Sequence, residues 1–363
     1  MMTLNEKIEE ALTRHDVELM RFEQGLVKDV MVDINQLKTE IVREIKMAEP
    51  QTQRELDGSL SAMDVAIDAA FAALVVQLGT ALQKFSQMEQ NAVAKIVDQT
   101  AKIPLLPSRF GAGTAAEIVE ETRIPNTPEG TTFRERWERI KTGLKSSLRS
   151  SLGYAIDNGQ SLDEKLRLVR GSRISGGRDG VVDKTKKGAE TVVRTSQQSV
   201  TMATRQALFN VNPEYVSGRQ AVAVLDSRTS FLCRTRNGWA WRSNGQPFRG
   251  TPIRFPGTPP WHFNCRTTLI PIFKSESDLQ KLLGHRGKTE LLALSRRFLI
   301  DGQPAPVPSF AKTFDAMTAV QQMEILGRGR FQLYKDKKIT LKELLDQNGR
   351  ELTLKELTAK YGD

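Results

Sequence analysis

The chain has 363 residues, a net charge of +10 and 39% hydrophobic residues, a composition typical of a folded protein with a sizeable core. Its two cysteines are too few for a disulfide scaffold. The most apolar window, Ala69–Leu82, is shorter than the roughly 18 residues of a membrane span. The small number of cysteines makes a reducing compartment the default expectation, and the polar start (Asn5, Glu6) shows no secretion signal.

The charge is divided unevenly along the chain. Residues 1–100 carry 10 Lys/Arg and 17 Asp/Glu, whereas residues 101–270 carry 27 Lys/Arg and 14 Asp/Glu. Arginines dominate this basic part, and their planar guanidinium groups suit phosphate and carboxylate partners. The division therefore indicates contact with nucleic acid or charge-complementary assembly, with a solvated basic surface as the alternative.

Residues 4–48 and about 60–97 predict two long helices, because apolar residues recur every three or four positions. Pro50 ends the first helix, so the chain is expected to fold back at Glu49–Gln53. At about 1.5 Å per residue each helix would be roughly 60 Å long. We assign residues 1–101 to a helical hairpin arm, whose length favours a structural or docking role over catalysis.

Residues 102–132 are rich in Pro and Gly and predict a linker around a short helical patch, Ala115–Glu121. Residues 133–217 predict a basic helical region. Its helices are expected at Phe133–Asp157, from the capping box at Ser161 to Gly171, and at Glu190–Val211.

Between the last two helices, residues 171–188 predict a glycine-rich basic loop. The loop lacks the GxxxxGK[ST] spacing of a nucleotide-binding loop, so we interpret it as a flexible or backbone-contacting segment. Candidate contacts to DNA or a partner are the basic residues in and around it: Arg167, Arg170, Arg173, Arg178, Lys184, Lys186 and Lys187.

From residue 218 the pattern changes to short β-rich stretches. Strands are expected at Gly218–Asp226 and Cys265–Phe273, with a turn at Arg228–Cys233 and a hairpin element at Gly238–Arg242. Residues 218–275 therefore predict a small β-rich core, and residues 276–363 a C-terminal helical region with a break, a Pro-rich loop and short final helices. The fold class predicted is α+β and mainly helical.

Three blocks of residues after Ala203 carry a family resemblance. The first is Leu225-Asp-Ser-Arg-Thr-Ser with Cys233 and Asn237-Gly238, and the second is Pro259-Pro-Trp-His-Phe-Asn-Cys-Arg266. The third is Leu326-Gly-Arg-Gly-Arg330, followed by two segments that end in Lys-Glu-Leu. In order and spacing these blocks resemble the minor head proteins of tailed phages that are named after the F protein of phage Mu.

The resemblance implies a minor capsid protein without enzymatic activity that acts in head morphogenesis and is present in multiple copies in the virion. It implies portal protein, major capsid protein or both as partners, with packaged double-stranded DNA as an additional candidate. The expected locations are the host cytoplasm during assembly and then the head interior or portal vertex. No membrane is expected in the assembled head.

Cys233, His262 and Cys265 are candidate metal ligands, because thiolate and imidazole groups on turns of a small sheet are the ligands of structural zinc. Asp226 or a water molecule would be the fourth ligand. In the family, extra thiols often stand where this chain has Ser230 and Thr267, so a closed zinc site, a disulfide and buried free thiols all stay open. In each case the two loops are held together, and the residues expected to shape them are Asn237, Gly238, Pro259, Pro260, Asn264 and Arg266.

Two other functions are open alternatives. The basic middle and the His262-Phe-Asn264 segment could form a nucleic-acid-binding or nuclease-like module, although a second metal ligand and a general base have no evident candidates. The amphipathic arms could instead serve DNA delivery after ejection, although an acidic arm is poorly suited to anionic lipid. The tryptophans at 239, 241 and 261 favour packing over base stacking.

Overall fold

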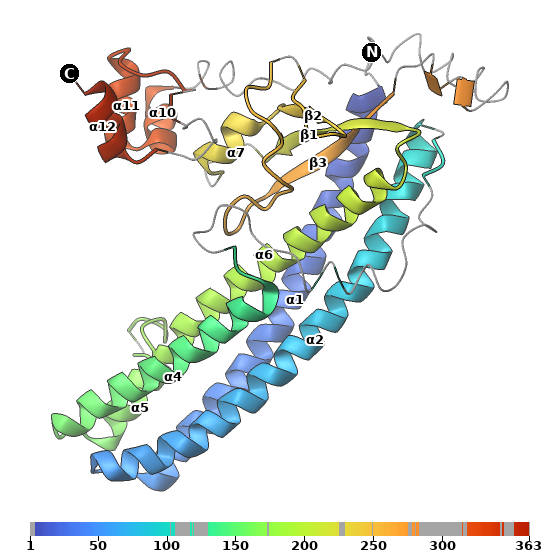
Figure 1. Cartoon of the computed structure of the whole chain (residues 1–363). Helices are drawn as coiled ribbons and strands as arrows, with labels where there is room; N and C mark the ends of the chain where they lie inside the picture. The colour runs from blue at the N-terminus through green and yellow to red at the C-terminus, as the bar shows by residue number, and fades with distance from the viewer. Residues whose placement is uncertain are drawn as a thin grey trace.

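Two long antiparallel helices form the spine of the protein (Figure 1). Helix α1 (Leu4–Ala48) and helix α2 (Gln53–Ala101) turn back on one another at residues 49–52. Helices α4 (Phe133–Asp157), α5 (Leu162–Arg170) and α6 (Val181–Asn210) pack along this hairpin. We call these five helices the stalk.

The computed structural model describes residues 4–101, 103–105, 117, 119, 130–172, 174–224, 229–248, 250–274, 278–279, 281–282, 314, 318–341, 343–344 and 352–362. Most of the predicted linker and of the segment 276–317 lies outside these residues. So do two of the candidate site residues, Arg173 and Asp226.

Local sequence signals set the helix ends that were predicted. Thr132 and Ser161 each accept a hydrogen bond from the backbone N–H three residues later, and a glutamate there bonds back to the cap. These capping boxes satisfy N–H groups that a helix leaves without partners. The predicted helices at 4–48, 133–157 and 162–170 are confirmed.

Two predicted helix starts are wrong. Helix α2 begins at Gln53 rather than near Leu60, and the Thr52 hydroxyl caps it by accepting a hydrogen bond from the Glu55 N–H. Helix α6 begins at Val181, so residues 181–188, which were predicted as loop, are helical and Lys184, Lys186 and Lys187 lie on a helix. Burial of Val181 in the stalk core outweighs the weak helix propensity of the glycines nearby.

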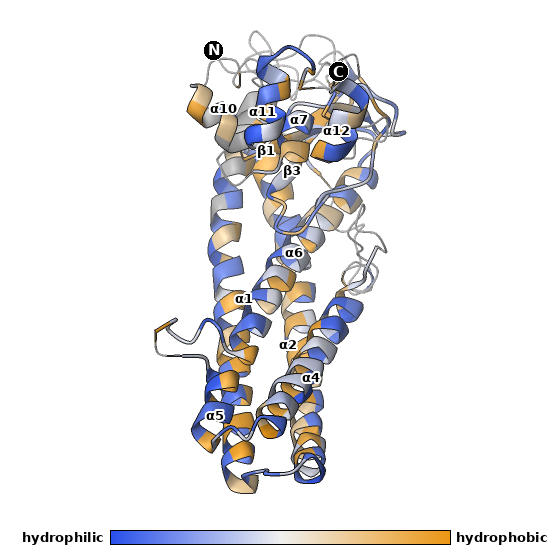
Figure 2. Cartoon of the chain, turned by 90° about the vertical axis from the view of Figure 1, so that its left-hand side faces the viewer, coloured by the Kyte–Doolittle hydropathy of each residue, from blue (hydrophilic) through white to orange (hydrophobic). Residues whose placement is uncertain are grey.

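The hairpin predicted as a separate arm shares one hydrophobic core with α4, α5 and α6. Ile34 and Ile41 of α1, Phe71 of α2, Trp137 of α4 and Val193 of α6 belong to the same buried cluster. Hydrophobic residues recur between hydrophilic ones along these helices, as expected for helices with one apolar side (Figure 2). The stalk is therefore a bundle rather than a free hairpin.

A small antiparallel sheet sits at the upper end of the stalk in Figure 1. Its strands are β1 (Val216–Ala223), β2 (Ala240–Arg242) and β3 (Thr267–Phe273), in the order β2-β1-β3. The predicted mainly helical α+β class is confirmed. Gly218 permits the close pairing of β1 with β2, because a Cβ atom there would lie 2.3 Å from the Trp241 carbonyl oxygen.

A short helix, α7 (Phe231–Arg236), replaces part of the turn that was predicted at Arg228–Cys233. The Ser230 hydroxyl caps this helix by accepting a hydrogen bond from the Cys233 N–H. Near the C-terminus lie α10 (Ala319–Leu326), α11 (Arg328–Lys335) and α12 (Leu354–Tyr361). They share a hydrophobic cluster with Phe231, so α7 joins the sheet to the C-terminal helices.

A buried group of charged side chains joins α1, α2 and α6 next to the sheet. The Arg205 guanidinium is fully buried and lies 2.7 Å from Glu89 and 2.6 Å from Asp16. The other Glu89 oxygen lies 2.6 Å from His15 Nε2. Apolar residues of α1, α2, α6, β1 and β3 form a cluster around the same junction. We call these four charged residues the junction network.

Among the described residues, the helical segment Gln53–Thr100 has the length and apolar composition of a membrane span. Of its apolar 18-residue window, 33% is buried in the stalk. Core helices of proteins that never enter a bilayer meet the same criterion, so this finding assigns no membrane role.

The junction network predicts a large effect of removing Arg205. Arg205→Met would leave the buried Glu89 and the partly buried Asp16 without this cation, and we expect a loss of about 3–5 kcal/mol in the free energy of unfolding. Urea unfolding followed by circular dichroism measures this loss. Arg149→Met is the matched control, since its ion pair with Asp57 is exposed and worth less than about 1 kcal/mol. Equal losses in the two variants would contradict the assignment.

His15 predicts a pH dependence of stability. Burial opposes the charged imidazole, but the hydrogen bond and charge of Glu89 outweigh it and raise the pKa of His15 above 6.5. A raised pKa means that the stabilisation is complete below the unfolded-state pKa and is lost as the pH rises through the folded-state pKa. The stability difference between wild type and His15→Gln should therefore be larger at about pH 6 than at about pH 9. A difference that is constant with pH would contradict this.

Candidate metal centre

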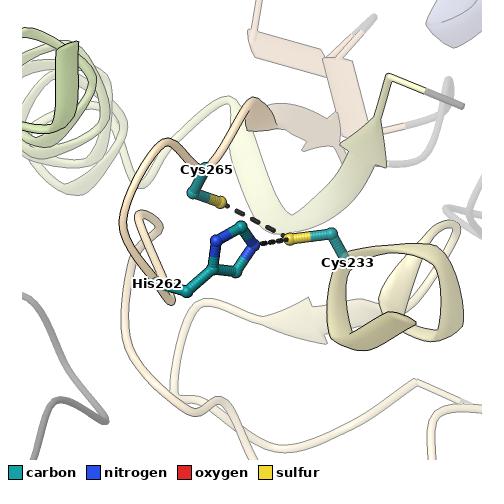
Figure 3. Close-up of side chains that lie close together, drawn as sticks. All are labelled: Cys233, His262 and Cys265. Atoms are coloured by element: carbon teal, nitrogen blue, oxygen red, sulfur yellow. Dashed lines mark hydrogen bonds between the residues drawn. The ribbon is translucent and has the colours of Figure 1, made fainter. Parts of the chain in front are cut away.

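Three candidate metal ligands converge between α7 and the loop that precedes β3 (Figure 3). Cys233 lies on α7, and His262 and Cys265 lie on the loop. Cys233 Sγ is 2.9 Å from His262 Nε2 and 3.5 Å from Cys265 Sγ. Both thiols are buried, and neither forms a disulfide. We call these three residues the Cys/His cluster.

Contacts at both ends of α7 hold Cys233 in place. Ser230 caps the N-terminus of the helix as described above. At the other end the Asn237 side-chain oxygen accepts a hydrogen bond from the Ala223 N–H at 2.9 Å. The Gly238 N–H donates to the Ala221 carbonyl at 2.8 Å, with a positive φ of 81° that favours glycine. Helix α7 is thereby fixed against strand β1.

The loop from Pro259 to Arg266 brings its two ligands to one side. The Pro259–Pro260 bond is cis, and Asn264 adopts a left-handed conformation with φ of 56°. The Cys265 N–H donates to the His262 carbonyl at 3.3 Å, which closes a tight turn between the two ligands. The Asn264 N–H donates to Thr195 Oγ1 of α6 at 3.2 Å, which ties the turn to the stalk.

The imidazole of His262 is oriented by a backbone contact. Its Nδ1 lies 2.8 Å from the Phe263 carbonyl oxygen. Because a carbonyl oxygen only accepts, Nδ1 carries the proton and donates. Nε2 faces the Cys233 thiol and the Ser230 hydroxyl, which lies 2.7 Å away. In a neutral ring, this tautomer directs a lone pair into the cluster.

The two thiols differ in their tendency to ionise. Burial disfavours the Cys265 thiolate, but the hydrogen bond from Cys233 and the nearby His262 ring outweigh burial and lower the pKa of Cys265 well below its usual range. The hydrogen bond to Cys265 and burial raise the pKa of Cys233. Cys265 is thus the more acidic thiol of the pair.

Ser230 was noted in the sequence only as a position where related proteins often have a cysteine. In the structure its hydroxyl lies beside His262 Nε2. Thr195 comes from α6, far away in sequence, and had no local signal that linked it to the cluster. Arg266 is half-buried and donates to the Thr229 hydroxyl at 3.4 Å.

Trp241 and Trp261 are fully buried and donate their indole N–H groups to backbone carbonyls, which confirms the packing role predicted for them.

The described basic residues proposed as DNA or partner contacts lie on α5, on the following loop and at the start of α6. Arg167, Arg170, Arg178, Lys184 and Lys187 are exposed, whereas Lys186 is half-buried. Lys186 Nζ pairs with Asp183 at 2.8 Å.

A cleft of about 910 Å³ lies between α1, α6, the end of β1 and the start of β3, with Cys265 in its wall. Arg194 of α6 crosses one side of it and contacts Glu23 of α1 as well as Glu190, the latter at 2.8 Å. Burial raises the pKa of Glu23 despite the opposing charge of Arg194. Sequence reasoning missed this cleft because its walls come from segments far apart in the chain.

Removal of the Asn237 side chain should loosen α7. Asn237→Ala leaves the buried Ala223 N–H without its acceptor, and we expect a loss of about 1–3 kcal/mol in the free energy of unfolding. It should also speed the reaction of Cys233 with a thiol reagent in the folded protein. Asn158→Ala is the matched control, because Asn158 is exposed and donates to the Tyr154 carbonyl outside the core. Unchanged stability and unchanged thiol reactivity in Asn237→Ala would contradict the role assigned to this side chain.

Comparisons of the chain with protein-family models, with curated proteins and with solved structures give no match. The functional reading therefore depends on the sequence blocks quoted above and on the geometry of the described residues.

Proposed function

We propose that the chain is a minor capsid protein of a tailed phage that acts in head morphogenesis and docks through its stalk onto the portal protein. The three sequence blocks between residues 203 and 363 support this proposal. The single observation that carries the docking role is an exposed, uncharged face on α2. Its place of action would be the host cytoplasm during assembly and then the head interior or portal vertex.

The docking face is a stripe along the outer side of α2. Its spacing of three, four and seven residues places its members on one side of the helix, about 33 Å from end to end. All of them are exposed and none is charged: Gly58, Ala62, Val65, Ala69, Ala72, Ala73, Val76 and Thr80. Val65 and Val76 are 70% and 67% exposed, unusual values for valine in a core helix.

The carboxylates of this part of α2 are turned toward α4. Asp57 pairs with Arg149 at 2.7 Å, and Asp68 pairs with Lys145 at 2.8 Å. These contacts leave the outer face of α2 without charge. Small side chains along such a face let the backbone of another helix approach closely, which favours a helix of the partner protein as the occupant.

Two further observations support a structural role over the nuclease-like alternative. The thiols of Cys233 and Cys265 are only 1% and 3% exposed, so a substrate would have little access to them. The exposed arginines at 167, 170 and 178 suit a secondary contact with packaged DNA or with an acidic partner surface.

The docking face is tested with Val65→Glu/Val76→Glu. Two carboxylates on the stripe should abolish close helix packing and reduce co-purification with the portal protein of the same phage at least tenfold. Val32→Glu is the matched control, because Val32 is a 47% exposed valine on α1 and lies off the stripe. The free energy of unfolding should change by less than about 0.5 kcal/mol in both variants.

Failure of the wild-type chain to bind the portal protein would contradict the proposed partner. Equal binding by wild type and by the double variant would contradict the proposed face. A nuclease activity that depends on a divalent metal and is lost in His262→Ala would favour the alternative function.

A further inference from the structure

We propose that Cys233, His262 and Cys265 bind one Zn²⁺ ion that fastens α7 to the loop preceding β3. This inference concerns the sheet region and is independent of the docking face on α2. It depends on the convergence of two sulfur donors and one imidazole nitrogen, on the orientation of the imidazole and on the charge balance of a buried site.

The donor atoms lie close to the positions of a tetrahedral site. All three are within 4.8 Å of one another. Zinc bonds of about 2.3 Å to sulfur and about 2.0 Å to nitrogen place two sulfurs about 3.8 Å apart and sulfur and nitrogen about 3.5 Å apart. The observed separations are 3.5 Å between the sulfurs and 2.9 Å between Cys233 Sγ and His262 Nε2.

An ion therefore requires the donors to separate by only a few tenths of an ångström. A disulfide requires the sulfurs to approach to about 2.05 Å, a much larger movement of about 1.5 Å. The metal also uses the Nε2 lone pair of His262, which faces Cys233 Sγ at 2.9 Å, whereas a disulfide would leave this nitrogen outside the new bond. The geometry favours the metal over the disulfide.

His262 is held in the form that a metal ligand needs. Nδ1 donates to the Phe263 carbonyl at 2.8 Å, so the Nε2 lone pair is directed at the sulfurs. Histidine ligands of zinc commonly donate their second ring N–H to such an acceptor, which fixes both the tautomer and the ring plane. This backbone contact is independent of the distances within the cluster.

Charge balance also favours a divalent cation. Two thiolates, one neutral imidazole and Zn²⁺ sum to zero, which avoids the high cost of an unpaired charge in the interior. Thiolate and imidazole ligands select zinc over magnesium or calcium, which prefer oxygen ligands. The three residues leave one position of a tetrahedron open, and a water molecule there would complete the coordination.

The ion would compensate for the small size of the sheet. The part of the chain that the structure describes has three strands, of which β2 spans only three residues, and most of the chain between Cys233 and His262 lies outside helices and strands. Small units of this kind gain much of their stability from a structural metal. Zinc at this site would join the start of β3 to α7 and, through Phe231, to the C-terminal helices.

The test uses the full chain, purified under reducing conditions without chelator. We expect about one zinc per chain by elemental analysis. Replacement by Co²⁺ should give the near-ultraviolet thiolate-to-cobalt band and the visible bands of tetrahedral coordination. Cys233→Ser, Cys265→Ser and His262→Ala should each weaken zinc binding about 100-fold or more. His15→Gln is the matched control and should keep both the zinc and the cobalt spectrum, because His15 lies on α1, pairs with Glu89 and is not part of the Cys/His cluster.

A wild-type chain that takes up neither added Zn²⁺ nor Co²⁺ after full reduction would overturn the inference. So would unchanged zinc affinity in both cysteine variants. The wild-type cobalt titration keeps the test valid if a variant fails to fold, and far-ultraviolet circular dichroism shows whether the stalk of each variant is intact.

Discussion

The burial of Arg205 between Glu89 and Asp16 is the contact on which the arrangement of the protein depends. It joins α6 to both helices of the hairpin at the level where α6 ends and the sheet begins. A buried charge tolerates few alternative arrangements, because each displacement leaves a carboxylate or the guanidinium without its partner. The network therefore favours one register of the three helices, which hydrophobic side chains of similar size would define less sharply.

From this junction, α6 determines where the Cys/His cluster lies. The Thr195 hydroxyl holds the turn at Asn264, and the Gln198 side chain donates to the Thr267 carbonyl at 2.8 Å. Strand β1 follows α6 and carries the donor and acceptor groups that fix the C-terminal end of α7. Helix α6 therefore positions both the loop that carries His262 and, through β1, the helix that carries Cys233. A change in the register of α6 would separate His262 from Cys233.

Much of the fold could be predicted from local patterns, because the stalk helices repeat apolar residues over many turns and carry capping residues at their ends. The convergence of Cys233, His262 and Cys265 also followed from ligand type and spacing. The start of α6, helix α7 and the cleft beside Cys265 could not be predicted in this way. They depend on contacts such as the burial of Val181 and the bond between Asn264 and Thr195, whose partners lie far apart in sequence.

The uneven charge of the chain is explained in part by pairing within the stalk. Acidic residues of the hairpin meet basic residues of the later helices, as in the contacts of Asp57 with Arg149 and Asp68 with Lys145. Part of the opposite charge of the two regions is therefore paired within the molecule. Only some of the basic residues between 101 and 270 stay available for an external contact. The same pairing turns the carboxylates of α2 away from its outer side, so the uncharged stripe on α2 is a consequence of how the stalk satisfies its own charges.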